Sequence, residues 1–86
     1  MVIDRETVAN RIGAYLRHGT TLPELVNWAE EAMMAGEFEE TDLEKTRDVV
    51  GRLGLADVRA FGLAWEDCET MLRELGYTVE LRIVAA

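Results

Sequence analysis

The chain has 86 residues, of which 49% are hydrophobic and 30% charged, and this composition predicts one small globular domain. Seventeen acidic against nine basic residues give a net charge of −8, which argues against binding to nucleic acid or to a membrane surface. A single cysteine excludes an internal disulfide. No apolar run is as long as a membrane-spanning helix, and the start of the chain does not have the pattern of a secretory signal, so we expect a cytoplasmic protein.

Helix-capping patterns and apolar spacing predict a mainly α fold. We expect a compact bundle of about four short helices with a short C-terminal β-strand, forming a single helical domain over residues 1–86. The expected helices cover residues 4–18, 22–35, 42–53 and 65–75, and the expected strand covers residues 78–84.

The first two helices have clear boundary signals. Asp4 can accept hydrogen bonds from the first-turn amides, and Gly19 is placed to take a left-handed cap at the end of the first helix. Thr21 and Glu24 have the T-x-x-E spacing of a capping box, which predicts the start of the second helix.

The last two helices are marked in the same way. Thr41 and Glu44 form a second T-x-x-E pair and predict the start of the third helix. Trp65 begins an apolar stripe at helical spacing, and Gly76 is expected to end the fourth helix.

After this helix, residues 78–84 change to a period of two, with Val79, Leu81 and Ile83 on one side. A lone strand needs a partner because its backbone groups would otherwise stay unpaired. Two partners are open: a short strand at residues 1–3, or the same strand of a second molecule across a two-fold axis, which would make a homodimer.

Catalytic and metal-binding patterns are scarce. The chain has no serine, so a serine nucleophile and the attachment point of an acyl carrier domain are excluded. Cys68 and His18 are the only thiol and imidazole, and they are too few for a zinc site. The acidic run after residue 36 does not have the spacing of a calcium loop. We therefore predict no catalytic residue, no metal and no cofactor.

The acidity is concentrated in residues 20–48, which carry −7 of the net charge. Acidic side chains around apolar ones are typical of a protein-binding face. The predicted face consists of Glu31, Met34, Glu37, Phe38, Glu39, Glu40 and Glu44. The alternative is that Phe38, with Trp28 and Met33, belongs to the core and that the acids only solvate the surface. The exposure of Met34 and Phe38 decides between the two.

The stretch from Tyr15 to Glu30, YLRHGTTLPELVNWAE, resembles a helix pair of small bacterial helical proteins, some without an assigned function and others immunity proteins of toxin systems. It covers about a fifth of the chain. The resemblance implies a compact helical protein that binds another protein, with acidic residues facing a basic toxin. It supplies no catalytic residues.

Three hypotheses for function follow. The first is a small acidic module that is not an enzyme and neutralises or regulates a basic protein partner. The second is a small-ligand-binding protein or thiol-based enzyme that uses Cys68 with His18 as its base. The third is a structural subunit that forms homo-oligomers through its C-terminal strand.

Overall fold

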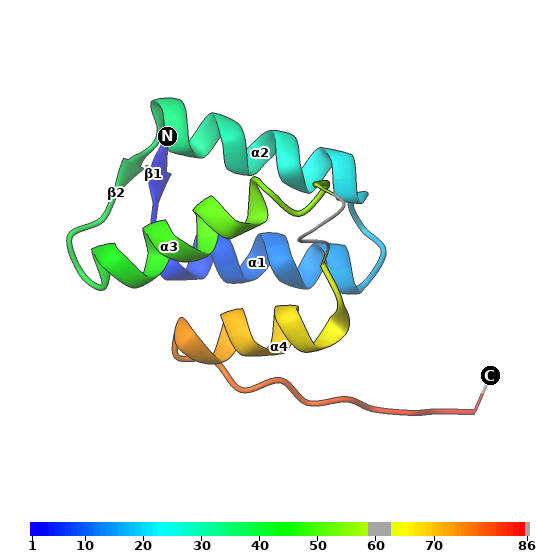
Figure 1. Ribbon diagram of the computed structural model, residues 1–86. Helices are drawn as coiled ribbons and strands as arrows, with labels where there is room; N and C mark the ends of the chain where they lie inside the picture. The colour runs from blue at the N-terminus through cyan, green and yellow to red at the C-terminus, as the bar shows by residue number, and fades with distance from the viewer. Residues whose placement is uncertain (59–62, 86) are drawn as a thin grey trace.

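The computed structural model describes residues 1–58 and 63–85, and among these residues the fold is mainly α-helical (Figure 1). The elements in chain order are β1 (Val2–Ile3), α1 (Arg5–Leu16), α2 (Leu22–Ala35), β2 (Glu37–Phe38), α3 (Leu43–Leu53) and α4 (Trp65–Glu74). The prediction of a mainly α fold with four short helices is confirmed for the described residues.

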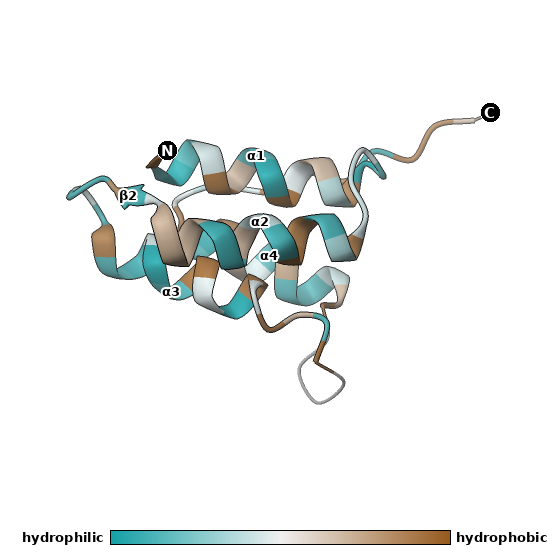
Figure 2. Ribbon diagram, turned by 90° about the horizontal axis from the view of Figure 1, so that it is seen from above, coloured by the Kyte–Doolittle hydropathy of each residue, from teal (hydrophilic) through white to brown (hydrophobic). Residues whose placement is uncertain are grey.

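The helices share one apolar interior. α1 contacts each of the other three helices, and α2 and α3 have the most extensive contact. Hydrophobic and hydrophilic residues alternate around the helices (Figure 2), as expected where one side of each helix is buried. The largest fully buried side chains include Ile3, Val8, Ile12, Leu25, Val49, Val50 and Leu53.

The two short strands lie side by side at the end of the bundle where α2 ends and α3 begins (Figure 1). They are parallel, with Val2 opposite Glu37 and Ile3 opposite Phe38. The amides of Glu37 and Glu39 donate to carbonyl groups of residues 1 and 3, at 2.7 and 2.9 Å. The N-terminal residues are thereby fixed beside the end of α2.

Gly36 makes this close approach possible. A Cβ at this position would lie 2.5 Å from the carbonyl oxygen of Ala32 and 2.8 Å from Cγ1 of Ile3. Both distances are too short for a side chain, so the chain can pass from α2 into β2 over the buried Ile3 only with glycine here.

Two of the predicted helix starts are confirmed. Asp4 caps α1, and its Oδ1 accepts from the amide of Thr7 at 2.8 Å. Thr21 and Glu24 form the predicted capping box of α2: the Glu24 amide donates to Thr21 Oγ1 at 3.3 Å, and the Thr21 amide donates to Glu24 Oε1 at 3.2 Å.

The predicted cap of the third helix is wrong. α3 begins after Asp42, which is left-handed with φ of 56° and makes no side-chain capping bond. The chain leaves β2 and must turn sharply into α3, and the left-handed residue makes this turn. Thr41 is thereby moved one position away from the cap, so no box with Glu44 forms.

The left-handed residue after α1 also differs from the prediction. It is His18, with φ of 63°, and not Gly19. α1 ends at Leu16, two residues before the expected end, so the left-handed position lies one residue earlier in the chain. Gly19 instead donates its amide to the carbonyl of Ala14 at 2.7 Å.

The prediction of a C-terminal strand is wrong for the single chain. Residues 78–84 are not assigned to a strand, and the two-stranded sheet of the described residues is N-terminal. The segment runs beneath α4 and leaves the bundle as an extended chain (Figure 1). The physical reason is the missing partner: residues 1–3, one of its two expected partners, pair with β2 instead.

Across residues 1–58 and 63–85, each helix falls short of the length and apolar character that crossing a membrane requires.

Candidate functional site

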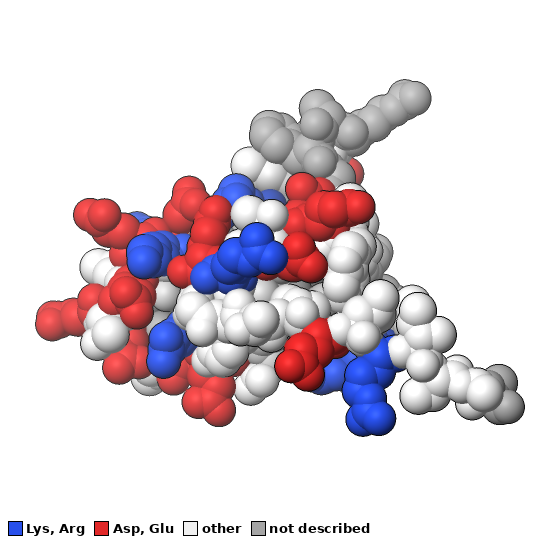
Figure 3. Space-filling view, turned by 90° about the horizontal axis from the view of Figure 1, so that it is seen from below, with Lys and Arg blue, Asp and Glu red and all other residues white. Residues whose placement is uncertain are grey.

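The predicted face lies at the end of the molecule where α2 ends, β2 crosses and α3 begins. Figure 3 shows acidic side chains gathered at this end, on the left of the view. We define the acidic end as six exposed carboxylates and one exposed methionine: Glu31, Met34, Glu37, Glu39, Glu40, Asp42 and Glu44.

Side chains alternate along β2 and the residue that follows it, and this separates the acids from the aromatic ring. Glu37 and Glu39 are exposed, whereas Phe38 between them is half-buried and packs against the core. The guanidinium carbon of Arg47 lies 6.0 Å from the centre of the Phe38 ring and covers part of its outer side. Phe38 therefore serves mainly the core, together with Trp28, which is 7% exposed.

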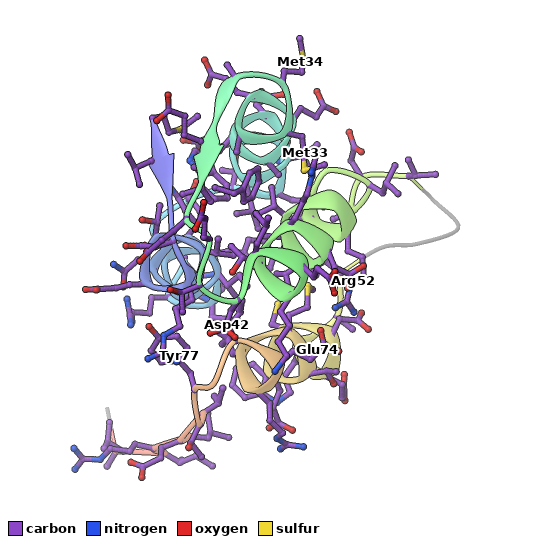
Figure 4. The ribbon with its side chains drawn as sticks, turned by 90° about the vertical axis from the view of Figure 1, so that its left-hand side faces the viewer. Met33, Met34, Asp42, Arg52, Glu74 and Tyr77 are labelled. Carbon is purple, nitrogen blue, oxygen red and sulfur yellow. The ribbon has the colours of Figure 1, made fainter. Side chains whose placement is uncertain are left out.

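The two neighbouring methionines at the end of α2 have different surroundings (Figure 4). Met33 lies between α2 and α3, and its Cε is 4.0 Å from the position that a Cβ on Gly51 would take. Met34 points away from the bundle and is 87% exposed, against 39% for Met33. Met34 is thus the apolar side chain of the acidic end that offers most of its surface to a partner.

The carboxylates of the acidic end take no part in the ion pairs found among the described residues. Those pairs join Arg52 to Asp48 at 3.0 Å, Arg52 to Glu74, and Arg73 to Glu69 at 3.3 Å. The last turn of α2 has no basic residue, and the C-terminal end of a helix is itself partly negative. The dipole of α2 therefore adds to the negative charge near Glu31 and Glu37, whereas Asp42 and Glu44 lie at the start of α3, where the helix end is partly positive.

A polar hollow of about 380 Å³ adjoins the acidic end. It is lined by Asp4, Arg5, Glu6, Glu39, Thr41, Asp42 and Tyr77. The guanidinium carbon of Arg5 lies 5.6 Å from the centre of the Tyr77 ring. Within the described ranges, three or more acidic, histidine or cysteine side chains are nowhere grouped in a way that would hold a metal ion. Arg5 is the cation among its lining residues, beside the carboxylates of Asp4, Glu6, Glu39 and Asp42.

The predicted face leaves out three exposed residues at this end of the molecule. Met1 and Val2 are 52% and 65% exposed; Val2 lies on β1, beside β2, and Met1 directly precedes it. Asp42 lies in the same acidic run as Glu40 and Glu44, so its charge was the signal that could have included it.

Cys68 and His18, the residues of the thiol hypothesis, lie in different surroundings. Cys68 is fully buried, and burial, with a smaller contribution from the negative charge of Asp67, raises the pKa of its thiol to about 11. His18 is exposed and lines a hollow of about 490 Å³ that Cys68 does not line. The described structure therefore gives Cys68 neither the access nor the low pKa that a thiolate nucleophile needs.

A scan against models of known protein families, and comparisons with curated proteins and with solved structures, found nothing that matches this chain.

Proposed function

We propose that this protein is a small protein-binding module whose acidic end docks a basic protein. One observation carries the proposal: six exposed carboxylates outside the described ion pairs lie at the same end of the molecule as Met34, which is 87% exposed. In such a complex the charges speed the encounter and exclude acidic partners, while an apolar contact slows dissociation. Flexible methionine side chains suit contact surfaces because they adapt their shape.

The charge arrangement is unfavourable for the isolated chain. Carboxylates of like sign repel one another, and cations, not anions, are favoured near the C-terminal end of a helix such as α2. Glu31 comes just before the last turn of α2 and Glu37 follows it. Cations of a partner would relieve both effects, which supports a binding role over simple solvation.

The polar hollow gives a place for one of those cations. Asp4, before α1, lines it together with Glu39 and Asp42, which lie in the connection between β2 and α3. A lysine or arginine of the partner would meet carboxylates from several directions there, and charge-assisted hydrogen bonds of this kind are shorter and stronger than neutral ones.

The resemblance of Tyr15–Glu30 to immunity proteins supports a neutralising or regulating role for this binding. The residues of the resemblance lie in α1, α2 and the turn between them, whereas the acidic end lies beyond them in the chain. In this proposal the helix pair supplies the scaffold and the following segment supplies the contact surface.

The test is a pull-down with the tagged full-length chain from its native host, at low and at physiological salt. We expect one stoichiometric basic protein that is retained at low salt and released as salt rises. The Glu37→Gln/Glu39→Gln variant should lose about tenfold in affinity for it. The matched control, Asp57→Asn/Glu66→Gln, removes two exposed acids elsewhere and should bind normally.

Two results would refute the proposal. One is a complex that is indifferent to salt, and the other is an equal loss of binding in both double variants, which would indicate only a net-charge effect. Met34→Ala gives an independent readout, because it should weaken binding about tenfold by loss of apolar burial while leaving the thermal unfolding midpoint unchanged.

A further inference from the structure

The C-terminal segment, residues 78–84, has the features of an unpaired β-strand. It leaves the bundle as an extended chain (Figure 1, Figure 2), and within the described residues its backbone groups enter no backbone hydrogen bond. Leu81, Ile83 and Val84 are 72%, 90% and 74% exposed. An extended backbone of this kind is a template for strand pairing, and its exposed apolar side chains favour burial against a partner.

The beginning of the segment is anchored to the bundle. Gly76 turns the chain out of α4 with φ of 94°, and the Tyr77 amide donates to the carbonyl of Leu72 at 2.9 Å. Val79 is half-buried and packs against the core. Because side chains alternate along an extended chain, Leu81 and Ile83 continue the face of Val79 beyond the edge of the bundle.

We propose that this segment pairs with the same segment of a second copy of the chain, as antiparallel strands about a two-fold axis at Leu81. In this register Glu80 lies opposite Arg82 of the second copy, and the pair occurs twice. On the other face Val79 lies opposite Ile83, and the two Leu81 side chains meet. Cross-strand pairs of opposite charge and of apolar side chains are those that stabilise a sheet.

The neighbouring registers are less favourable. A slip of one residue would put apolar side chains opposite charged ones, since it exchanges the two faces of one strand. A slip of two residues would put Glu80 opposite Glu80 or Arg82 opposite Arg82, and parallel pairing in register would do both. Like charges directly opposite each other are destabilising, so the sequence of the segment favours a single register.

The bundle also offers a surface for the second copy. A hollow of about 400 Å³ lies between α1, α4 and residues 77–81, and its lining includes Leu16, Trp65 and Leu72. Val79 faces the core at this place, and paired residues of a ladder project from the same face. Ile83 of the second copy would therefore be directed toward the hollow, which adds apolar burial to a pairing that two strands alone would make only marginally stable.

The first test exchanges the charges of the pair and measures the dimer dissociation constant by sedimentation over a wide concentration range. Glu80→Arg and Arg82→Glu should each weaken the dimer about tenfold, because each creates two like-charge pairs. The double variant restores the opposite charges and should return to within about threefold of the original constant. Glu31→Arg, with the same charge change at the acidic end, is the matched control and should leave the dimer unchanged.

The second test reports the register through disulfide formation. Leu81→Cys should form an intermolecular disulfide readily, because paired residues have Cα atoms about 4.5 to 5.5 Å apart, within the range of a disulfide. Ile83→Cys should not, because two residues at this position would lie about 14 Å apart along the ribbon. Cys68 needs no replacement, since it is fully buried.

A chain that stays monomeric at the highest concentration would overturn the proposal. So would equal disulfide formation at both positions, or a double charge variant no stronger than the single ones. These variants leave the core intact, because residues 80–84 are exposed and outside the helices.

Discussion

The acidic end and the C-terminal segment are both exposed, but they offer a partner different kinds of interaction. The acidic end is held by packed helices and a hydrogen-bonded strand pair, and what it offers is negative charge. The C-terminal segment extends beyond the bundle, and what it offers is backbone hydrogen-bonding groups with exposed apolar side chains.

This difference bears on partner choice. Charge acts over a distance and admits many basic surfaces, so the acidic end favours fast and salt-dependent association. Strand pairing acts only in contact and in register, so it favours a partner with a matching sequence, such as a second copy. Two surfaces of such different chemistry can operate independently in one small protein.

The largest expected effect separates the bundle from the C-terminal segment. Leu53→Ala should lower the free energy of unfolding by about 2 to 5 kcal/mol, because Leu53 is fully buried and its removal leaves a cavity. Ile83→Ala should change it by less than about 0.5 kcal/mol in the monomer. Urea denaturation at low protein concentration measures both. A similar loss for Ile83→Ala would mean that the segment belongs to the folded core.

The next effect concerns how rigidly the acidic end is built. Gly36→Ala should cost about 1 to 3 kcal/mol, because the new Cβ would clash with Ala32 and Ile3 and push β1 away from α2. Gly51→Ala is the control: its Cβ would meet only Met33 at 4.0 Å, and helix propensity should add up to about 1 kcal/mol of stability. Thermal unfolding compares the two. An unchanged midpoint in Gly36→Ala would show that the strand pair is loosely held.

A smaller effect is expected from a buried hydroxyl in α3, the helix that follows the acidic end. Thr46 is 1% exposed and its Oγ1 has no hydrogen-bond partner in the described structure. Thr46→Val keeps the branched shape and removes the unpaired group, so it should raise the free energy of unfolding by about 1 kcal/mol. Thr46→Ala should lower it, because it leaves a cavity. A destabilised Thr46→Val would contradict the prediction and indicate that the hydroxyl is hydrogen-bonded in solution.

The smallest effect is a pH dependence at the margin of the acidic end. Hydrogen bonds from the Thr7 hydroxyl and amide hold the pKa of Asp4 below its ordinary value of 3.8. A lowered pKa in the folded state means that the stabilisation is fully present above the ordinary value and is lost as the pH falls through the folded one. Asp4→Asn keeps a capping side chain without this titration, so its unfolding midpoint should fall less on acidification. Equal falls would assign the acid sensitivity to other carboxylates.

Much of the fold could be predicted from local patterns. Asp4 and the Thr21–Glu24 box act within one helical turn, so their spacing alone was enough to place two helix starts. The placement of His18 and Asp42 in left-handed backbone could not be predicted, because it depends on where neighbouring elements force the chain to turn.

In the candidate site, too, some features could be predicted from local patterns and others depended on distant contacts. The exposure of the acids agrees with their pattern, since charged side chains stay in water, whereas the sequence left the exposure of Met34 open. The half-buried position of Phe38 and the exposed Val2 followed from the pairing of β1 with β2, which joins residues 35 positions apart. No local pattern near Phe38 indicated this pairing.

The sequence by itself determined the helices, most of their ends and the concentration of negative charge, because these depend on residues within a turn of one another. Only the tertiary structure decided which extended segments pair. A strand makes its backbone hydrogen bonds to other strands, and the alternation of its own side chains does not specify which segment pairs with it. Residues 1–3 were therefore joined to β2, and residues 78–84, with the clearer strand pattern, were left unpaired within the described chain.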